Sequence, residues 1–359
     1  MERERGGTAG IMAPDLTQRR INWHSERLKE RHGDRVWRLG IDAGFTCPHR
    51  SQDRQRGGCR YCAPDGNIAA YQKGLGCSTP LSLETQISRA LAFTSRRYGA
   101  RAFFLYFQAY TCTNAPVSAL VDLYERGIGI CRRLIEPGQL KGLVVSTRPD
   151  CFDQEKAALL ASFMAQGLEV WVEFGLQSAH ASTLAFIHRN HDTKSFLDAM
   201  EVAQAAGLRR AVHLLLGLPG ESRGQMVDSA RFTASTLPDG VKFHDLRIVR
   251  GSAFARAFEA GEISCMHPSR LPGLLADCLE VLPPAAEIIR LNADFRPEET
   301  ILIHPPPDKH RLALQVEEEL ARRGTFQGQS FDRTIRGTIR GQSFEADIET
   351  GSPAPPAGP

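Results

Sequence analysis

The chain has 359 residues, of which 42% are hydrophobic and 24% are charged. A chain of this length and composition can bury a large core, which excludes a small disulfide-stapled scaffold and a wholly disordered protein. No apolar run reaches the roughly 18 residues that a membrane-spanning helix needs. The opening MERERGG is not followed by an apolar segment, so we expect neither a membrane partner nor a secretory signal.

Basic and acidic residues nearly balance, 44 against 41, and leave a net charge of +3. The first sixty residues are more basic, with 13 lysines and arginines against 8 acidic residues. This excess is compatible with nucleic acid, although a solvated helix face is the simpler explanation. Nine cysteines without an export signal predict a reducing, cytoplasmic location, where close-spaced cysteines are metal ligands or catalytic thiols rather than disulfides.

From residue 36 to residue 246, short apolar runs alternate with longer helical patterns. The predicted strands are Val36–Ile41, Ala102–Phe107, Leu143–Ser146, Glu169–Phe174, Ala211–Leu216 and Val241–Leu246. The predicted helices lie near 82–98, 116–134, 153–166, 193–206 and 221–235, after a short helix at 22–33. This alternation indicates an α/β fold with a buried parallel sheet, either open or closed into an incomplete barrel. Chemistry should then lie at the carboxyl ends of the strands.

We expect four regions along the chain. Residues 1–15 form a disordered N-terminus, 16–261 the main α/β unit, 262–324 a C-terminal α+β extension, and 325–359 a disordered tail. The extension should contain helices near 268–281 and 308–323 with a strand near 286–291. The tail carries two copies of GQSF, too few for a solenoid.

The strongest local pattern is GFTCPHRSQDRQRGGCRYC, which places Cys47, Cys59 and Cys62 directly after the first predicted strand. Gly57 and Gly58 free the backbone for a tight turn just before Cys59. Thiolates select zinc or iron–sulfur clusters. The pattern therefore predicts a metal centre.

The number of ligands leaves three kinds of site open. A structural zinc site takes four ligands, and His49 or Cys77 could complete one. Three cysteines on a four-iron cluster would instead leave one iron open for a substrate or cofactor. A redox-active dithiol is the third alternative. The count favours the cluster.

Further motifs follow in order between residues 106 and 246. They are YFQAYT, STRPD, VWVEFGLQSAH, HRNHD, HLLLGLPGE and VKFHDL. With these motifs and the aromatic Tyr61 before Cys62, the last cysteine of the cysteine pattern, the sequence resembles the radical SAM superfamily over residues 18–322. It is most similar to the YhcC-like branch, which is related to the radical domain of the Elongator catalytic subunit.

The resemblance implies a partial (βα)6 TIM-like barrel with a [4Fe–4S] cluster on Cys47, Cys59 and Cys62. The remaining iron would bind S-adenosylmethionine through its amino and carboxylate groups. One electron would enter the sulfonium, the S–C5′ bond would break, and the 5′-deoxyadenosyl radical would take a hydrogen atom from the substrate. The cofactors carry this step, and the protein orients them and closes the site.

The resemblance also implies which residues hold the cofactor. Gln108, Tyr110 and Thr111 stand near the methionine moiety; Glu173, Gln177 and Ser178 face the ribose and methionine side; Arg189 holds the carboxylate or a ribose hydroxyl; and Gly217, Pro219 and Gly220 approach the adenine. Arg148, Asp150, Lys242 and His244 are candidates for substrate contact or proton transfer. A satisfied ion-pair network is the alternative for these last four.

Three of these residues invite simpler explanations. Glu173 lies inside an apolar strand, where an unpaired carboxylate is costly, so it needs a cation or a hydrogen-bond partner; a structural ion pair would suffice. Gln177 and Ser178 could instead cap a helix.

In HRNHD, Asn190 stands where relatives carry glycine. Asparagine tolerates the left-handed backbone, so we expect the turn to persist.

Three functional classes remain. The favoured one is a radical SAM enzyme that receives its electron from a reductant of flavodoxin or ferredoxin type. Kinship with the Elongator subunit suggests RNA, such as a tRNA base, as its substrate. The alternatives are a non-catalytic zinc or iron–sulfur module for structure or electron transfer, and an RNA-binding scaffold.

Overall fold

The structure is a computed structural model that describes residues 19–54, 56–62, 66, 68–72, 81–293, 297–301 and 308–332. The predicted N-terminal region 1–15, residues 333–359 of the predicted tail and Cys77 lie outside the described residues.

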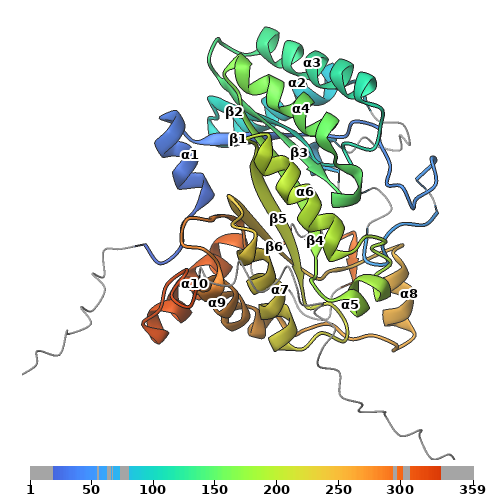
Figure 1. Cartoon of the computed structure of the whole chain (residues 1–359), viewed down its shortest axis with the longest axis vertical. Helices are drawn as coiled ribbons and strands as arrows, with labels where there is room; N and C mark the ends of the chain where they lie inside the picture. The colour runs from blue at the N-terminus through green and yellow to red at the C-terminus, as the bar shows by residue number, and fades with distance from the viewer. Residues whose placement is uncertain are drawn as a thin grey trace, which may run out of the picture.

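A seven-stranded parallel sheet forms the centre of the molecule (Figure 1). Its strands, in spatial order, are β1 (Val36–Ile41), β2 (Ala102–Phe107), β3 (Leu140–Thr147), β4 (Glu169–Gln177), β5 (Arg209–Leu216), β6 (Gly240–Asp245) and β8 (Glu287–Arg290). A separate antiparallel pair joins β7 (Ile248–Val249) to β9 (Thr300–Ile301). The six predicted strands are confirmed, with ends shifted by at most a few residues.

Helices connect the strands in the order expected of a half-barrel. They are α1 (His24–His32), α2 (Leu83–Tyr98), α3 (Val117–Leu134), α4 (Gln154–Ser162), α5 (Ala181–Phe186), α6 (Thr193–Ala205), α7 (Arg223–Ser235), α8 (Ala253–Glu259), α9 (Leu271–Val281) and α10 (Lys309–Arg323). The predicted helices are confirmed, whereas α5 and α8 are new. Of the helices described, none is long and apolar enough to cross a bilayer.

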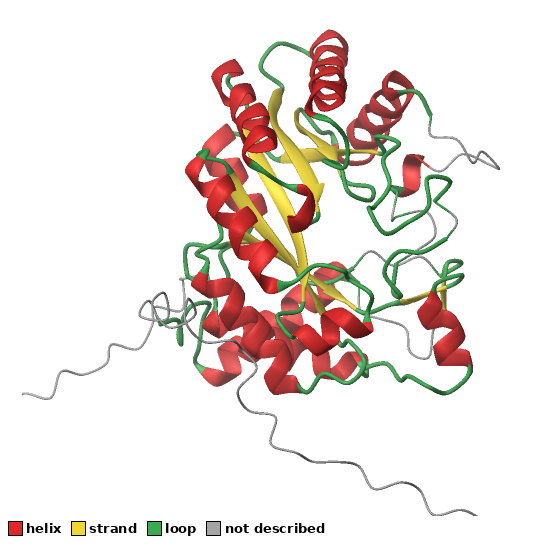
Figure 2. Cartoon of the chain, turned by 45° about the vertical axis from the view of Figure 1, so that its right-hand side comes forward, coloured by secondary structure: helices red, strands yellow, loops and turns green. Residues whose placement is uncertain are grey.

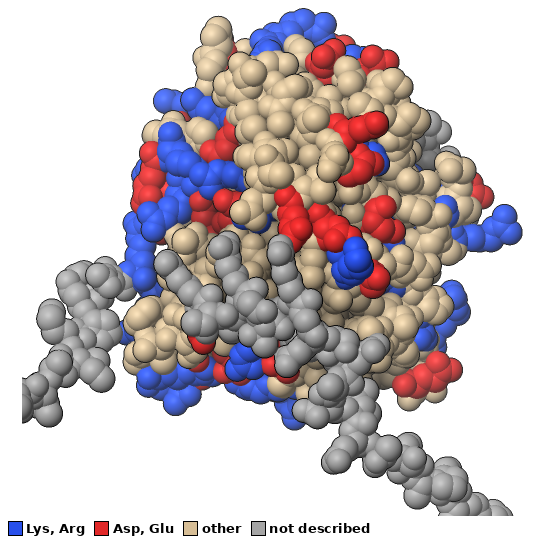
Figure 3. All heavy atoms as spheres, viewed as in Figure 1, with Lys and Arg blue, Asp and Glu red and all other residues tan. Residues whose placement is uncertain are grey.

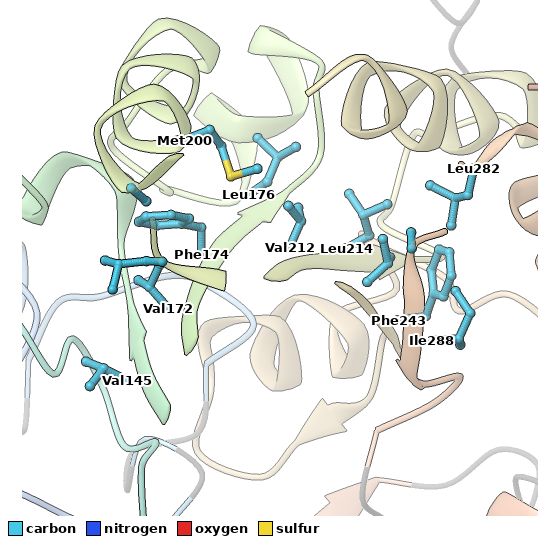
Figure 4. Close-up of a cluster of buried hydrophobic side chains, with 14 of the residues drawn as sticks. Val145, Val172, Phe174, Leu176, Met200, Val212, Leu214, Phe243, Leu282 and Ile288 are labelled. Atoms are coloured by element: carbon cyan, nitrogen blue, oxygen red, sulfur yellow. The ribbon is translucent and has the colours of Figure 1, made fainter. Parts of the chain in front are cut away.

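The sheet separates an apolar layer from a polar interior because side chains alternate along each strand. In β4, Val172, Phe174 and Leu176 point to the outer layer, where they meet residues such as Met200 of α6 (Figure 4). The intervening residues of β4, such as Glu173, point into the half-barrel. In Figure 2 most helices lie on one side of the curved sheet, and loops that follow the strands gather on the other.

The helix α1 covers the amino-terminal end of the half-barrel and contacts both edge strands, β1 and β8. His24 of α1 packs edge-on against Trp171, with ring centroids 5.0 Å apart. Its Nδ1 lies 2.7 Å from Oε2 of Glu287 in β8. Arg31 of the same helix donates to Oε1 of Glu287 at 2.5 Å. These contacts close the amino-terminal end of the half-barrel interior, which we call its floor.

Two findings differ from the expected organisation. The strand predicted near 286–291 joins the main sheet beside β6 instead of staying within the extension, which pairs an edge that would otherwise expose backbone groups. Residues 325–332, expected to begin the disordered tail, are also held in place. The side chain of Gln327 donates to the carbonyls of Pro283 and Ala286 at 2.9 and 2.7 Å and accepts from the backbone N–H of Asn22.

Candidate active site

The described residues between Cys47 and Cys59, 48–54 and 56–58, fold back as a short hairpin whose arms are joined by an antiparallel bridge. The backbone N–H of Gly58 donates to the carbonyl of His49 at 2.9 Å. Gly57 has φ 79°, and a Cβ there would lie only 2.4 Å from that carbonyl oxygen. The predicted turn at Gly57 and Gly58 is therefore confirmed, and it brings the first cysteine back toward the Cys-x-x-Cys pair.

Arg54 fixes the tip of this hairpin to the end of β1. Its guanidinium donates to both carboxylate oxygens of Asp42, at 2.8 and 2.9 Å, and to the carbonyl of Phe45 at 2.7 Å. The same guanidinium lies over the ring of Tyr110, 4.3 Å from its centroid. Tyr110 has a left-handed backbone, φ 60°, a strained conformation that needs support from its surroundings.

Cys47 contacts a residue that follows β2, and Cys62 is influenced by the other two cysteines. The hydroxyl of Thr111 donates to Sγ of Cys47 at 3.2 Å. Burial raises the pKa of Cys62 to about 12, and the nearby thiolates of Cys59 and Cys47 add to this rise. The three thiols therefore act on one another electrostatically.

Cys59 has a much more acidic thiol than Cys62. Nη1 of Arg189 lies 3.5 Å and Nε2 of His49 3.6 Å from its sulfur. Burial opposes ionisation, but the Arg189 charge and the His49 hydrogen bond outweigh it and lower the pKa of Cys59 to about 6. At neutral pH this sulfur is a thiolate, which is the form that binds metals.

The donor set suits soft metal ions. Thiolates are the ligands of iron–sulfur clusters and of zinc. In the described part of the chain, no group of three or more His, Cys, Asp or Glu side chains is positioned to hold a single metal ion.

Arg189 is held in place by groups at the ends of β3 and β4. Its Nη2 donates to the carbonyl of Gly175 at 2.6 Å. The buried Arg148 donates to the carbonyls of Arg189 and Asn190 at 2.6 and 3.0 Å, and Asp150 pairs with Arg148 through both carboxylate oxygens. Asn190 has φ 55°, so the expected left-handed turn is confirmed.

The fit between Gly175 and Arg189 yields a prediction. A Cβ at Gly175 would lie 2.5 Å from Nη2 of Arg189, so Gly175→Ala must displace the guanidinium from Cys59. We expect the pKa of Cys59 in the metal-free protein to rise by about one to two units, because a hydrogen bond from a charged donor is worth about 1.5–3 kcal/mol. The pH profile of iodoacetamide alkylation of Cys59, followed by peptide mass spectrometry, measures this.

Arg189→Gln should shift that profile in the same direction. Gly129→Ala on α3 is the matched control, since a Cβ there meets no atom within 4 Å. An unchanged Cys59 profile in folded Gly175→Ala would contradict this assignment of Arg189.

A second polar cluster fills the interior below the cysteines, centred on the fully buried carboxylate of Glu173. Tyr106 donates to its Oε2 at 2.7 Å, and Lys242 donates to the same oxygen at 3.0 Å. His213 Nε2 lies 2.9 Å from Oε2, and Arg38 pairs with Oε1. Each partner comes from a different strand, and we call these five residues the ionic layer. The expectation that Glu173 needs a cation or a hydrogen-bond partner is confirmed.

The pKa values of the residues in the ionic layer depend on burial and on the charges of their neighbours. Burial alone would raise the pKa of the Glu173 carboxyl, but Arg38 and Lys242 hold that pKa well below its usual range. Burial lowers the pKa of Lys242 to about 8 and that of His213 to about 4. Near neutral pH, Glu173 is therefore ionised and His213 is neutral.

Removing the central charge should destabilise the fold. Glu173→Gln leaves Arg38 and Lys242 without a buried counter-charge, and breaking a buried ion pair in this way costs about 3–5 kcal/mol. Urea unfolding at pH 7 measures the loss. Glu125→Gln, on the exposed face of α3, should change the free energy of unfolding by no more than about 0.5 kcal/mol. A loss for Glu173→Gln as small as that of the control would show that the ionic layer is not a determinant of stability.

The remaining predicted residues lie around the carboxyl edge of the sheet. The imidazole of His244 stands 5.6 Å from that of His213, between ring centroids. Gln108 lies against β1, where a Cβ on Gly40 would approach its Cδ to 3.1 Å. Gln177 ends β4 with φ 77°.

Ser178 and the loop after β5 complete this edge. The hydroxyl of Ser178 donates to Glu221 at 2.5 Å and accepts from the N–H of His180, the residue before α5. Gly217 and Gly220 have φ 81° and 87° and flank Pro219. Ser178 is not the cap of α5, because the N-cap position is His180, which makes no side-chain capping bond.

Sequence reasoning missed three residues of these clusters, namely Arg38, Tyr106 and His213 of the ionic layer. His49, which the sequence offered as a possible zinc ligand, lies against the sulfur of Cys59. The sequence does contain a signal for Arg38, Tyr106 and His213, because each of them interrupts an apolar run at a position that faces the interior. Their convergence depends on how the strands align.

Comparison with known proteins places this geometry in a family. The profile of the radical SAM superfamily matches residues 46–233, and that of the Radical_SAM C-terminal domain matches residues 238–322. Protein YhcC of Escherichia coli is 33% identical over 279 residues, 78% of this chain and 85% of that protein. An uncharacterized protein of Methanocaldococcus jannaschii is 30% identical over 308 residues, 85% of this chain and 91% of that protein.

More distant relatives share part of the sequence or the fold of this chain. Human Elongator complex protein 3 is 25% identical over 159 residues, 43% of this chain and 28% of that protein. The solved structure of Elp3 from Methanocaldococcus infernus aligns with a TM-score of 0.57 at 16% identity. That alignment covers 68% of this chain and 59% of the solved one, and it shows a shared fold.

The cysteine hairpin thus lies at the carboxyl edge of a parallel half-barrel, a fold that the chain shares with Elp3. By sequence, the chain belongs to the radical SAM superfamily. The members of this superfamily are enzymes that use an iron–sulfur cluster and S-adenosylmethionine.

Proposed function

We propose that this protein is an enzyme that cleaves S-adenosylmethionine reductively at a [4Fe–4S] cluster held by Cys47, Cys59 and Cys62. The observation that carries the proposal is the hairpin that returns Cys47 toward the Cys59 pair at the carboxyl edge of the half-barrel. The acidic thiol of Cys59 supports it, because a pKa of about 6 makes this sulfur a ready metal ligand at neutral pH.

When bound, the cluster would supply one electron to S-adenosylmethionine, and the 5′-deoxyadenosyl radical released would abstract hydrogen from the substrate. Thr111 and Arg189 contact the cysteine sulfurs and therefore flank the position that the cofactor would take. We assign Gln108, Tyr110, Gln177 and the loop Gly217–Gly220 to the walls of this position.

Residues of the interior would act on the substrate side. Lys242 has a pKa of about 8 because of burial, so its Nζ can release or take up a proton near neutral pH. His244 stands two residues further along the same strand. We assign Glu173 to positioning Lys242, and Arg148 with Asp150 to positioning the turn that carries Arg189.

Replacing the cysteines tests the proposal. Cys47→Ser, Cys59→Ser and Cys62→Ser should each lose the reconstituted cluster and lower 5′-deoxyadenosine formation by at least about a hundredfold, because the thiolates are the cluster ligands. Iron analysis, the visible absorption spectrum and product chromatography after anaerobic reconstitution and dithionite reduction measure this.

Cys265→Ser is the matched control for these variants, since Cys265 is partly exposed and outside the cysteine hairpin. It should keep both iron and activity. A wild-type protein with a fully loaded cluster that never forms 5′-deoxyadenosine, or one that holds stoichiometric zinc instead, would contradict the proposed function.

We propose RNA as the substrate class to test first. We also propose that the protein acts in the reducing cytoplasm. The similarity to Elongator complex protein 3 supports RNA as the substrate, although charges on the face shown in Figure 3 are interspersed in sign. A strain that lacks this protein should lose a modified nucleoside, which should reappear on complementation with the wild type but not with Cys59→Ser. Mass spectrometry of total RNA nucleosides measures this, and an unchanged profile would argue for a small molecule or peptide.

A further inference from the structure

A pocket of about 430 Å³ opens beside the cysteine pair. Cys59 and Cys62 both line it. The other lining residues are Arg50, Arg56, Arg60, Arg256, His188 and the small residues Gly57, Gly58, Gly251, Ser252 and Ala253. The described lining thus contains four arginines and no carboxylate. This one-sided charge contrasts with the interspersed charges seen in Figure 3.

The four arginines fall into two kinds. Arg50 and Arg60 are held by the protein: Arg50 donates to the carbonyl of Arg54, and Arg60 lies over the rings of Phe186 and Phe254. Arg56 and Arg256 are exposed, and neither forms an ion pair with any described residue. These two guanidinium groups are available to a partner.

We propose that this arginine pocket is the docking surface for an acidic electron-transfer protein that carries a low-potential flavin or iron–sulfur centre. This inference rests on the proposed function. Its physical basis is that the positive field which attracts an acidic partner surrounds the opening at which two cluster cysteines line the surface. A donor docked there would bring its redox centre next to the two cysteines that line the pocket.

The lining favours an acidic protein over RNA. Proteins that hold single-stranded nucleic acid add aromatic platforms on which the bases stack. The only ring among the described lining residues is the imidazole of His188. Phe186 and Phe254 do not line the pocket, and Arg60 lies over one face of each ring.

The electron balance of the step is simple. The reduced donor loses one electron and the cluster gains one. No bond forms or breaks at the interface, and no proton needs to cross it. The donor then leaves in its oxidised state.

Charge reversal at the two exposed arginines tests the proposal in the reconstituted enzyme. Arg56→Glu combined with Arg256→Glu should slow cluster reduction by reduced flavodoxin at least about tenfold at low ionic strength. The decline of the wild-type rate with added salt should also disappear. Stopped-flow absorbance of the cluster measures the rate, and calorimetry with oxidised flavodoxin measures binding without any turnover.

Two controls separate docking from other effects. Photoreduced deazaflavin, a small reductant, should reduce the cluster of the double variant and support 5′-deoxyadenosine formation at wild-type rates. Arg126→Glu, an equal charge change at an exposed site on α3, should leave the flavodoxin rate within about twofold of wild type.

The outcomes are distinguishable. A double variant with the wild-type rate and salt dependence for both flavodoxin and a plant-type ferredoxin would overturn the docking proposal. So would weakened RNA binding with unchanged reduction, which would make the pocket an RNA site. Failure of wild-type enzyme to form 5′-deoxyadenosine with deazaflavin would instead count against the proposed function.

Discussion

The interior of this half-barrel depends on one buried carboxylate. Glu173 accepts hydrogen bonds or ion pairs from β1, β2, β5 and β6 through a single side chain. Taking two cationic side chains out of water is costly unless a counter-charge meets them. Glu173 supplies that counter-charge, so polar residues can line an interior that would otherwise have to be apolar. The floor beneath them is sealed by α1 and its contacts with Glu287.

The same strand connects this layer to the cysteines. Two residues beyond Glu173, the carbonyl of Gly175 holds Arg189, and Arg189 reaches the sulfur of Cys59. Arg148 and Asp150, at the end of β3, fix the turn that carries Arg189. The strand β4 therefore contributes both to the charge of the interior, through Glu173, and to the acidity of the Cys59 thiol, through Gly175 and Arg189.

Much of this fold follows from the sequence because apolar runs and helical periods are local. The six strands and the longer helices emerge at nearly their observed bounds, and the glycines before Cys59 give the turn that they predict. The pairing of β8 with β6 does not, since it depends on segments far apart in the chain. Likewise, the need of Glu173 for a partner is readable from its apolar surroundings, whereas Arg38 and His213 become its partners only through the alignment of the strands.

The open iron can be tested directly by the electron paramagnetic resonance spectrum of the reconstituted, reduced protein, recorded before and after addition of S-adenosylmethionine. Three thiolate ligands leave one iron open, so the cluster signal should change when the cofactor is added, with broadening from an isotopically labelled amino or carboxylate group. A cluster signal that is indifferent to S-adenosylmethionine would contradict an open iron that binds the cofactor.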